Sequence, residues 1–451
     1  MSTRGIALSA KPATRGTVGF LEDLFPAPRA YLIELWDGSE LPATEAAKFS
    51  LVIKHSAALR RMITPPLERS LGEAYIYGDI DIRGDLFSAD RLIDQMAGRT
   101  FSAGEVLRQL RQALALPTGG PPRAVGRGPA RLYGRRHSRV RDRAAIQFHY
   151  DVGNDFYSLW LDRNLQYSCA YFAADSDDLD TAQVRKMDHL CRKLRLQPGE
   201  RLLDIGCGWG GLALHAAQHY GVQVLGVTLS QQQWAHAESW VERLGLRHRV
   251  RFELKDYRDL QEVPFDKVVS IGMFEHVGRD HLPEYFAKAH RLLGPGGLFL
   301  NHGISRRAAL DRIPLGPQGS RPPAWRRWIE AWLLGPGSFS QRYVFPDGEL
   351  VPVSQANLAA EKAGFEVRDV ENLREHYALT LRRWVGRLEA RGEDARRASD
   401  EITFRTWRLF LAAAALGFER GQISVNQTLL SKPDRGQARL PLTRAHLYSG
   451  G

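Results

Sequence analysis

The sequence predicts an α/β protein with a doubly wound, mostly parallel sheet and a smaller, mainly helical domain at its N-terminus. Three observations support this prediction. Beyond residue 200, short apolar runs alternate with segments of helical periodicity, as in a parallel sheet that helices cover on both faces. The first 117 residues have mostly helical spacing. Between these parts, TGGPPRAVGRGPARLYGRRHSRVRDR is rich in Gly, Pro and Arg and lacks apolar periodicity, which indicates a linker.

Changes in composition place the domain boundaries. At 451 residues the chain is long for a single domain. We therefore expect a small domain over 1–117, a basic linker over 118–144, a larger domain over 145–435 and a tail over 436–451.

The spacing of apolar residues also predicts the elements of each domain. In the small domain, we expect helices near 43–63, 86–98 and 102–116, and short strands near 31–36 and 74–83. In the larger domain, we expect strands at 201–205, 222–227, 250–254, 265–271 and 298–302, and helices at 211–219, 230–244 and 281–293. Ligands of such sheets bind at the carboxyl ends of the strands.

The first strand of the larger domain ends in a glycine-rich turn, RLLDIGCGWGG. Asp204 precedes Gly206, Gly208 and Gly210, so the spacing is D-x-G-x-G-x-G and not the G-x-G-x-x-G of dinucleotide sites. A pyrophosphate binds bare backbone N–H groups and gains nothing from a carboxylate. S-adenosylmethionine carries an ammonium group and a sulfonium, which an acid favours. The turn therefore favours S-adenosylmethionine, with a dinucleotide or a turn without ligand as alternatives.

The second strand agrees with that preference. A dinucleotide domain places an acid at the end of this strand to bind the ribose. Here the strand runs into GVTLSQQQ, which offers Thr228, Ser230 and Gln233 instead.

Composition excludes several classes of protein. The longest apolar stretch, at 409–418, is about half of the ~20 residues that span a bilayer, and the N-terminus resembles no signal peptide, so we expect a cytoplasmic protein. Cys169, Cys191 and Cys207 have no metal-ligand spacing and do not form a disulfide framework. The net charge of +11 predicts an anionic partner, either nucleic acid or an acidic membrane surface.

Further motifs are more specific than the glycine turn. They are QFHYDVGNDFYSLWLDRNLQYSCAYF at 147–172, DYRDL at 256–260, SIGMFEHVG at 270–278 and NHGI at 301–304. In order and spacing, these motifs resemble the cyclopropane-fatty-acyl-phospholipid synthase family over roughly 145–435. The resemblance implies a class I methyltransferase fold, a Rossmann-like form of the predicted sheet.

The resemblance also implies an activity. Such enzymes transfer a methylene group from S-adenosylmethionine to the cis double bond of unsaturated acyl chains in membrane phospholipids. A carbocation forms and loses a proton to a bound bicarbonate ion, which closes the cyclopropane ring. Two alternatives remain: a related methyltransferase that gives methyl- or methylene-branched chains, or a non-catalytic relict that binds lipid or nucleic acid.

The family's site residues carry over by position. The implied ligands of the bicarbonate are Cys169, Glu275, His302, the backbone of Ile304, and Tyr377. The implied cofactor residues are Tyr167, Ser168, Asp204, Gly206, Cys207, Gly208, Trp209, Gly210, Thr228, Leu229, Ser230, Gln233, Asp256 and Tyr257. Among these, 167–168 and the glycine turn meet the amino-acid end, 228–233 the ribose and 256–257 the adenine. No metal is implied.

The chemistry of an alkene explains why such a set is needed. An isolated double bond is a weak nucleophile, so positioning and the exclusion of water must supply most of the rate. A base must then stand close to the cation. We therefore expect Glu275 to lie near an anion and to have a raised pKa or a shared proton. Phe148, Tyr150, Phe156 and Tyr157 are candidates for a lid over cofactor and acyl chain.

An insertion separates this chain from the family pattern. Residues 306–341 contain Trp325, Trp328 and Trp332 at helical spacing among arginines. This composition is typical of an interfacial helix, or of an extra helix packed on the domain. We expect the protein to lie in the cytoplasm, peripheral at the inner membrane face. The expected partner is an anionic phospholipid surface with unsaturated acyl chains and no specific nucleic acid. The N-terminal domain would present lipid or form a homodimer.

Overall fold

The computed structural model describes residues 15–89, 92, 103–261, 263–308 and 339–448. These residues form two compact units. Of the described residues, the larger unit contains those within 129–308, 343–399 and 414–448. The smaller unit contains those within 15–128, 339–342 and 400–413. The smaller unit thus includes residues that we expected in the larger domain.

The smaller unit combines helices with a sheet of four strands in the order β2-β1-β3-β4. The strands are β1 (Tyr31–Glu34), β2 (Glu40–Leu41), β3 (Phe49–Ile53) and β4 (Ile80–Gly84). The helices are α1 (Arg15–Leu24), α2 (Ala58–Ile63), α3 (Leu67–Ile76), α5 (Ala103–Ala115) and the 3-10 helix η1 (Leu86–Ala89). β3 lies at the centre, parallel to β1 and antiparallel to β4.

Two expectations for this unit are wrong in part. The helix expected at 43–63 is confined to α2, because the apolar run FSLVI forms the central strand β3. The range 74–83, expected to be a strand, begins with the last residues of α3, and only its later part forms a strand, β4. Short apolar runs fit a buried strand and a buried helix equally well, so periodicity does not separate them. Most of 86–98 lies outside the described residues.

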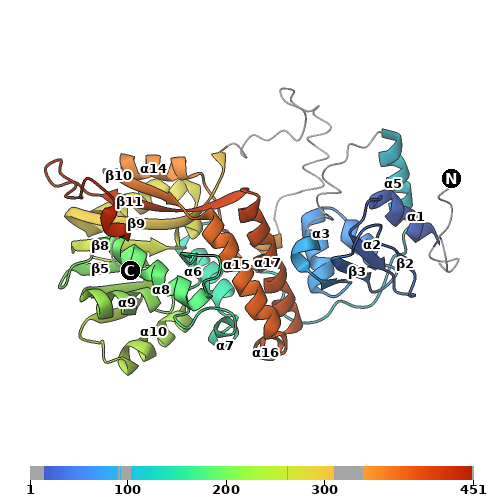
Figure 1. The fold of residues 1–451 in the computed structure, drawn as a ribbon, viewed down its shortest axis with the longest axis horizontal. Coiled ribbons are helices and arrows are strands. Elements are labelled where there is room, and N and C mark those ends of the chain that lie inside the picture. The colour runs from blue at the N-terminus through green and yellow to red at the C-terminus, as the bar shows by residue number, and fades with distance from the viewer. Residues whose placement is uncertain (1–14, 90–91, 93–102, 262, 309–338, 449–451) are drawn as a thin grey trace. The chain divides into compact units, whose positions relative to one another are not determined.

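The larger unit contains a seven-stranded sheet in the order β10-β11-β9-β8-β5-β6-β7 (Figure 1). The strands are β5 (Arg201–Ile205), β6 (Gln223–Thr228), β7 (Val250–Leu254), β8 (Phe265–Ile271), β9 (Leu293–Arg306), β10 (Glu366–Asn372) and β11 (Ile423–Ser431). The pairs from β9 to β7 are parallel, whereas β11 is antiparallel to both of its neighbours. The predicted doubly wound, mostly parallel fold is confirmed.

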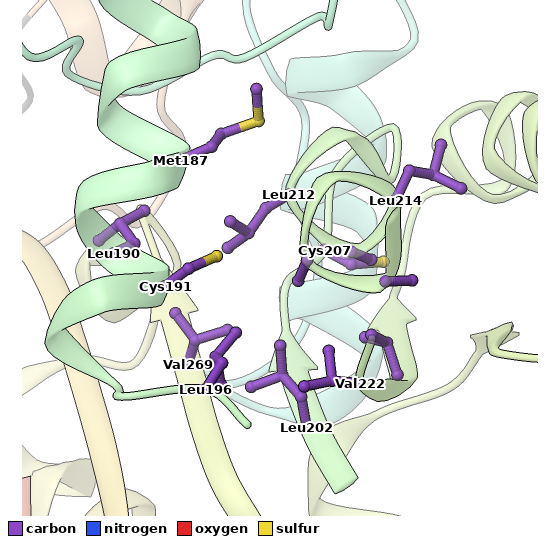
Figure 2. Close-up of a cluster of buried hydrophobic side chains, with 14 of the residues drawn as sticks. Met187, Leu190, Cys191, Leu196, Leu202, Cys207, Leu212, Leu214, Val222 and Val269 are labelled. Carbon is purple, nitrogen blue, oxygen red and sulfur yellow. The ribbon is translucent and has the colours of Figure 1, made fainter. Parts of the chain in front are cut away.

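Two apolar clusters cover opposite faces of this sheet. One joins α8 (Leu179–Lys193), α9 (Gly211–Tyr220) and α10 (Gln231–Arg243) to the strands, and Figure 2 shows part of it. The other joins α11 (Leu282–Leu292) and α14 (Val353–Lys362). Successive residues of β5 serve different clusters, Leu202 the first and Leu203 the second. This alternation follows from the two-residue period of a strand.

The ends of the larger unit differ from the expected boundaries. Helix α6 (Arg139–Tyr150) begins inside the stretch that we expected to be a linker. The expected tail contains α18 (Ala445–Tyr448), whose Leu447 is buried, and α18 contacts α8. Trp325, Trp328 and Trp332 of the insertion lie outside the described residues. No helix in the described part of the chain has both the length and the apolar character to cross a bilayer.

Candidate active site

The glycine turn joins β5 to α9 at the carboxyl edge of the sheet. Gly206, Gly208 and Gly210 have φ values of +80°, +56° and +90°, a region that L-amino acids with side chains avoid. A Cβ atom on Gly210 would lie 2.6 Å from the ring of Phe252. The turn therefore requires glycine at Gly210 for two reasons, backbone conformation and space.

Two adjoining cavities, both open to solvent, lie beside this turn. The smaller is lined by Tyr167, Ser168, Asp204, Cys207 and Trp209 among the expected cofactor residues. The larger is lined by Thr228, Leu229, Asp256 and Tyr257 among them. Gly206, Gly208 and Gln233 line both. The residues expected at the adenine thus line the larger cavity, and Tyr167 and Ser168, expected at the amino-acid end, line the smaller one.

Two expected cofactor residues line neither cavity. Gly210 precedes the first residue of α9 and packs against Phe252. Ser230 is fully buried, and its Oγ accepts a hydrogen bond of 3.3 Å from the backbone N–H of Gln233. Ser230 thus caps the N-terminus of α10. The structure gives both residues a role in forming the turns beside the cavities.

A buried lysine stands behind the smaller cavity. Lys186, on α8, donates hydrogen bonds to Gln166 Oε1 at 2.6 Å and Ser168 Oγ at 3.0 Å. Burial lowers its pKa to about 8, and the negative charges of Asp162 and Asp204 oppose this shift. Burial raises the pKa of Asp204 to about 7, and Lys186 opposes that shift. The carboxylate and the ammonium thus favour each other's charged form.

Polar groups at the ends of β6 and β7 line the larger cavity. Thr228 Oγ1 donates to Gln233 Oε1 at 2.8 Å. The Asp256 carboxylate accepts hydrogen bonds of 2.9, 3.1 and 2.6 Å from the guanidinium of Arg258. The same guanidinium reaches Asp142 of α6 at 3.1 Å. An ion-paired network therefore ties α6 to the adenine side of the cavity.

Of the four aromatic residues expected to form a lid, Tyr150 is the one that lines the two cavities. It stands at the end of α6 and packs edge-on against Trp209 with the ring centroids 5.8 Å apart. Phe156 and Tyr157, on α7 (Asn154–Ser158), are completely buried. Both residues pack against Trp160 and line neither cavity. Phe148 is half-buried on α6.

Two helices hold the segment YSCAYF in place. The Gln183 side chain of α8 donates to the backbone carbonyl of Ser168 at 2.9 Å. From α15 (Arg374–Ala390), Thr380 Oγ1 accepts from the backbone N–H of Ala170 at 3.0 Å. Cys169 is completely buried, and burial raises the pKa of its thiol well above the usual range. A thiol in this state is not a nucleophile.

Glu275 and His302 form the polar end of the site. Glu275 follows β8 in the short 3-10 helix η3 (Phe274–His276), and its Oε1 accepts a hydrogen bond of 2.6 Å from the Ile304 N–H. His302 stands on β9 with Gln427 Nε2 of β11 at 3.3 Å from its Nδ1. Burial raises the pKa of Glu275 to about 7, in the direction that we expected, and lowers that of His302 to about 3.

Several buried atoms of these residues have no hydrogen-bond partner in the described part of the chain. They are Glu275 Oε2, His302 Nε2 and Gln427 Oε1. Such atoms are costly unless something binds them. The Ile304 N–H, which we expected to bind an anion, donates to Glu275 instead.

Tyr377 lies on α15, nine-tenths buried, with the Phe418 ring 4.6 Å away. Burial raises the pKa of its hydroxyl well above the usual range, and proximity to the ionisable groups of Cys169, Glu275 and Tyr150 acts in the same direction. This coupling indicates that Tyr377 shares an environment with those residues. None of the five expected anion ligands lines either of the two cavities, although His276, next to Glu275, lines the larger one.

Sequence reasoning missed Lys186, Gln427, Arg258 and the lining residue His276. Arg258 follows the motif residues Asp256 and Tyr257 directly, so its position was a usable signal. Lys186 and Gln427 stand in ordinary helical and strand patterns that carry no such signal. Cys191 and Cys207 lie in the apolar cluster of Figure 2, and Cys207 also lines the smaller cavity. In the described residues, no group of three or more His, Cys, Asp and Glu is arranged to hold a metal ion.

A family model described as mycolic acid cyclopropane synthetase matches residues 137–428, which is more than half of the chain. The chain belongs to this family. A probable fatty acid methyltransferase of Pseudomonas putida is 40% identical over 418 residues, which are 92% of this chain and 95% of that protein. The cyclopropane-fatty-acyl-phospholipid synthase of Escherichia coli K12 is 38% identical over 285 residues, which are 63% of this chain and 66% of that protein.

Solved structures agree with this assignment. The mycolic acid cyclopropane synthase CmaA1, solved with S-adenosylhomocysteine (SAH) and CTAB, superposes with a TM-score of 0.57 at 35% identity. The match covers 64% of this chain and 97% of that one. The cyclopropane synthetase family member described here therefore has the fold of S-adenosylmethionine-dependent methyltransferases.

The residues of this family member fit both implied small molecules. A carboxylate at the smaller cavity suits the ammonium of an amino-acid tail, and hydroxyl and amide groups at the larger cavity suit a ribose. The unpartnered polar atoms of Glu275 and His302 suit a small oxyanion. Such an ion can accept a hydrogen bond from a ring N–H and share a proton with a carboxyl group.

Proposed function

We propose that this protein transfers a methylene group from S-adenosylmethionine to the cis double bond of unsaturated acyl chains in membrane phospholipids, giving cyclopropane chains. The observation that carries the proposal concerns Glu275, which accepts from the Ile304 N–H, and His302, two residues before Ile304 on β9. Both side chains are buried, and each keeps one polar atom without a partner in the described part of the chain. Bound S-adenosylmethionine would supply the methyl group, and a bound bicarbonate would supply the base. We further propose that the protein works in the cytoplasm, at the inner membrane face.

The residues of the chain would act by binding, orientation and exclusion of water. Asp204 and Ser168 would hold the amino-acid end of the cofactor, and the walls around Tyr150 would keep the site dry. His302 would donate a hydrogen bond to the anion. Glu275, with a pKa near 7, would hold or share a proton there.

A second candidate function follows from the extent of the matches. The Pseudomonas putida relative, described as a probable fatty acid methyltransferase, matches 92% of this chain, whereas the Escherichia coli synthase matches 63%. This difference favours a methyl- or methylene-branched acyl chain as the alternative product. Both products need the same cofactor and the same alkene, and they differ in which proton the cation loses.

A product assay tests the proposal. Purified protein is mixed with methyl-labelled S-adenosylmethionine and vesicles of unsaturated phospholipid, and the hydrolysed acyl chains are analysed by NMR. We expect cyclopropane signals from the wild type. Since Glu275 supplies the polar end of the site, Glu275→Gln should reduce labelling by roughly 100-fold or more, as is usual for loss of a group that handles a proton.

Glu375→Gln is the matched control, because Glu375 is a largely exposed acid on α15. It should retain wild-type labelling. Detection of methyl- or methylene-branched chains would support the same cofactor and substrate class, and it would assign the second candidate function to the protein. The absence of label from the lipid of the wild type would contradict both candidates.

A further inference from the structure

Gln427 faces His302 across two antiparallel strands. β9 and β11 pair in a register that places His302 directly opposite Gln427. Directly opposed residues project to the same side of a sheet, with their Cβ atoms about 4.5–5.5 Å apart. Both side chains are buried, with 2% and 0% of their surfaces exposed. The register of the strands thus fixes the contact between Gln427 Nε2 and His302 Nδ1.

This contact determines which ring nitrogen carries the hydrogen. A carboxamide nitrogen has two hydrogens and acts only as a donor. With the carboxamide nitrogen of Gln427 turned toward the ring, as in this structure, Nδ1 of His302 accepts, and the single hydrogen of a neutral imidazole then resides on Nε2. Nε2 is itself buried and has no partner among the described residues. The ring thus presents an unused N–H donor.

The surroundings keep the ring neutral. Burial is the main cause of the low pKa of His302, and the positive charges of Lys186 and Lys193 add to it. Glu371 acts in the opposite direction without overcoming them. Because a neutral ring has one hydrogen only, the side chain at Nδ1 decides whether Nε2 is a donor or an acceptor.

We propose that Gln427 is a positioning residue that holds His302 as the Nε2–H tautomer, so that the ring donates a hydrogen bond to the small oxyanion of the reaction. The role of the anion rests on the proposed function, whereas the tautomer does not. The opposite tautomer would present the lone pair of Nε2 to the anion, and two acceptors repel each other. Gln427 thereby acts through His302 and touches neither of the two cofactor cavities.

NMR of the full-length protein labelled with 15N-histidine tests the tautomer without substrate, cofactor or anion. Protonated and unprotonated ring nitrogens have well-separated shifts, and His302→Gln assigns the signal among the 14 histidines. In the wild type we expect hydrogen on Nε2 alone. In Gln427→Glu the carboxylate accepts, so the hydrogen should move to Nδ1. In Gln427→Leu nothing fixes Nδ1, so a mixture should appear.

Asn426→Ala is the matched control. Asn426 is the preceding residue of β11, and its side chain donates to Ser305 Oγ at 2.7 Å, so this variant loses a buried hydrogen bond between the same strands. Its His302 signal should stay as in the wild type. Hydrogen on Nδ1 in the wild type would overturn the proposal even if a variant failed to fold. An unchanged tautomer in a folded Gln427→Leu would overturn it as well.

Addition of bicarbonate separates this inference from the proposed function. We expect bicarbonate to shift the Nε2 signal of the wild type and of Asn426→Ala, and to leave unchanged the Nε2 signal of Gln427→Glu, whose Nε2 carries no hydrogen. If the wild type has hydrogen on Nε2 but its signal does not shift with bicarbonate, the role of the anion is refuted. The tautomer assignment then still stands. The affinity of each Gln427 variant for SAH should stay within about twofold of wild type, because the cofactor cavities are untouched.

Discussion

Single buried charges control the chemistry of this site at the scale of the residue. Asp204, Glu275 and Lys186 are all buried and have pKa values that burial moves toward neutrality. Perturbed groups of this kind gather at functional sites because catalysis needs protons that move near the working pH. Because of these residues, both the stability and the activity of the protein should depend on pH.

Glu275→Gln should remove one part of that pH dependence. The folded-state pKa of Glu275 lies near 7, above its ordinary 4.5, so the native state holds an extra proton between these values. The resulting stabilisation is present in full below about pH 4 and is lost as the pH rises through 7. From pH 5 to pH 8 the free energy of unfolding of the wild type should fall by about 2–3 kcal/mol relative to Glu275→Gln.

Thermal unfolding of both proteins in bicarbonate-free buffers across this range measures the difference. Glu375→Gln should follow the wild type at every pH. A constant difference between wild type and Glu275→Gln would mean that Glu275 is ionised throughout.

Lys186→Met should weaken cofactor binding. The change removes the hydrogen bonds to Gln166 and Ser168 and the charge that keeps Asp204 ionised. We expect about tenfold weaker binding of SAH at pH 7.5, measured by calorimetry, because one charged hydrogen bond contributes about 1.5–3 kcal/mol. The affinity for SAH should increase with pH as Asp204 ionises. In Lys186→Met this increase should occur at a higher pH, because the pKa of Asp204 is higher without Lys186.

Lys267→Met provides the comparison. Lys267 is a buried lysine on β8 that pairs with Glu200 at 3.5 Å and lines neither cavity. Its loss should lower stability and leave SAH affinity unchanged. Equal effects of both variants on affinity would mean that Lys186 acts through general stability alone.

At the scale of the element, strand ends and turns position the site. The turn after β5 and the ends of β6 and β7 bring the cofactor residues to one edge of the sheet. That edge is where parallel sheets bind their ligands. The ends of β8 and β9 add Glu275 and His302, and antiparallel β11 adds Gln427.

Gly210→Ala should destabilise the turn. A methyl group there would meet Phe252 at 2.6 Å in a backbone conformation with φ of +90°. We expect a loss of about 2–4 kcal/mol, seen as a clearly lower melting temperature. In Gly208→Ala the added Cβ meets no atom within 4 Å, so this variant should lose only the ~1–2 kcal/mol of the left-handed conformation. Equal melting temperatures would contradict the role of Phe252.

The larger unit was more predictable from sequence than the smaller one. β5, β7 and β8 begin and end where the sequence predicts. β5 and β8 lie inside the sheet and are mostly apolar, whereas β7, at its edge, alternates buried and exposed residues. β10, with the sequence EVRDVEN, is too polar for that pattern and was not predicted. In the smaller unit, β3 was assigned to a helix because a five-residue apolar run has no distinctive period.

The candidate site divides in the same way. Cofactor residues sit in contiguous motifs, so a short stretch of sequence identifies them. The partnership of His302 with Gln427 spans 125 positions and that of Lys186 with Gln166 spans 20, and strand register and helix packing create both. Such contacts have no local signature in a single sequence.

At the scale of the whole molecule, charge is the informative property. The net charge of +11 supports an anionic phospholipid surface as the partner that we propose. Binding to vesicles should increase with the fraction of anionic lipid and should weaken between about 0.05 and 0.5 M salt, because the screening length then falls severalfold. Sedimentation of the protein with vesicles measures this.

Competition with DNA distinguishes the remaining alternative. A protein that binds lipid should prefer anionic vesicles to a duplex of equal charge. Equal binding to neutral vesicles would refute the electrostatic account. Salt-sensitive affinity for DNA without vesicle binding would favour the non-catalytic, nucleic-acid-binding alternative instead.

The seven-stranded sheet places its two chemical tasks on different strands. The parallel strands β5, β6 and β7 end at the cofactor cavities, while the antiparallel pair of β9 and β11 holds His302 and Gln427. Substitutions along the antiparallel pair can therefore accumulate in a lineage without loss of cofactor recognition. Divergence among descendants of such an enzyme should therefore be found in β9 and β11, and a library built to evolve new products should target these two strands.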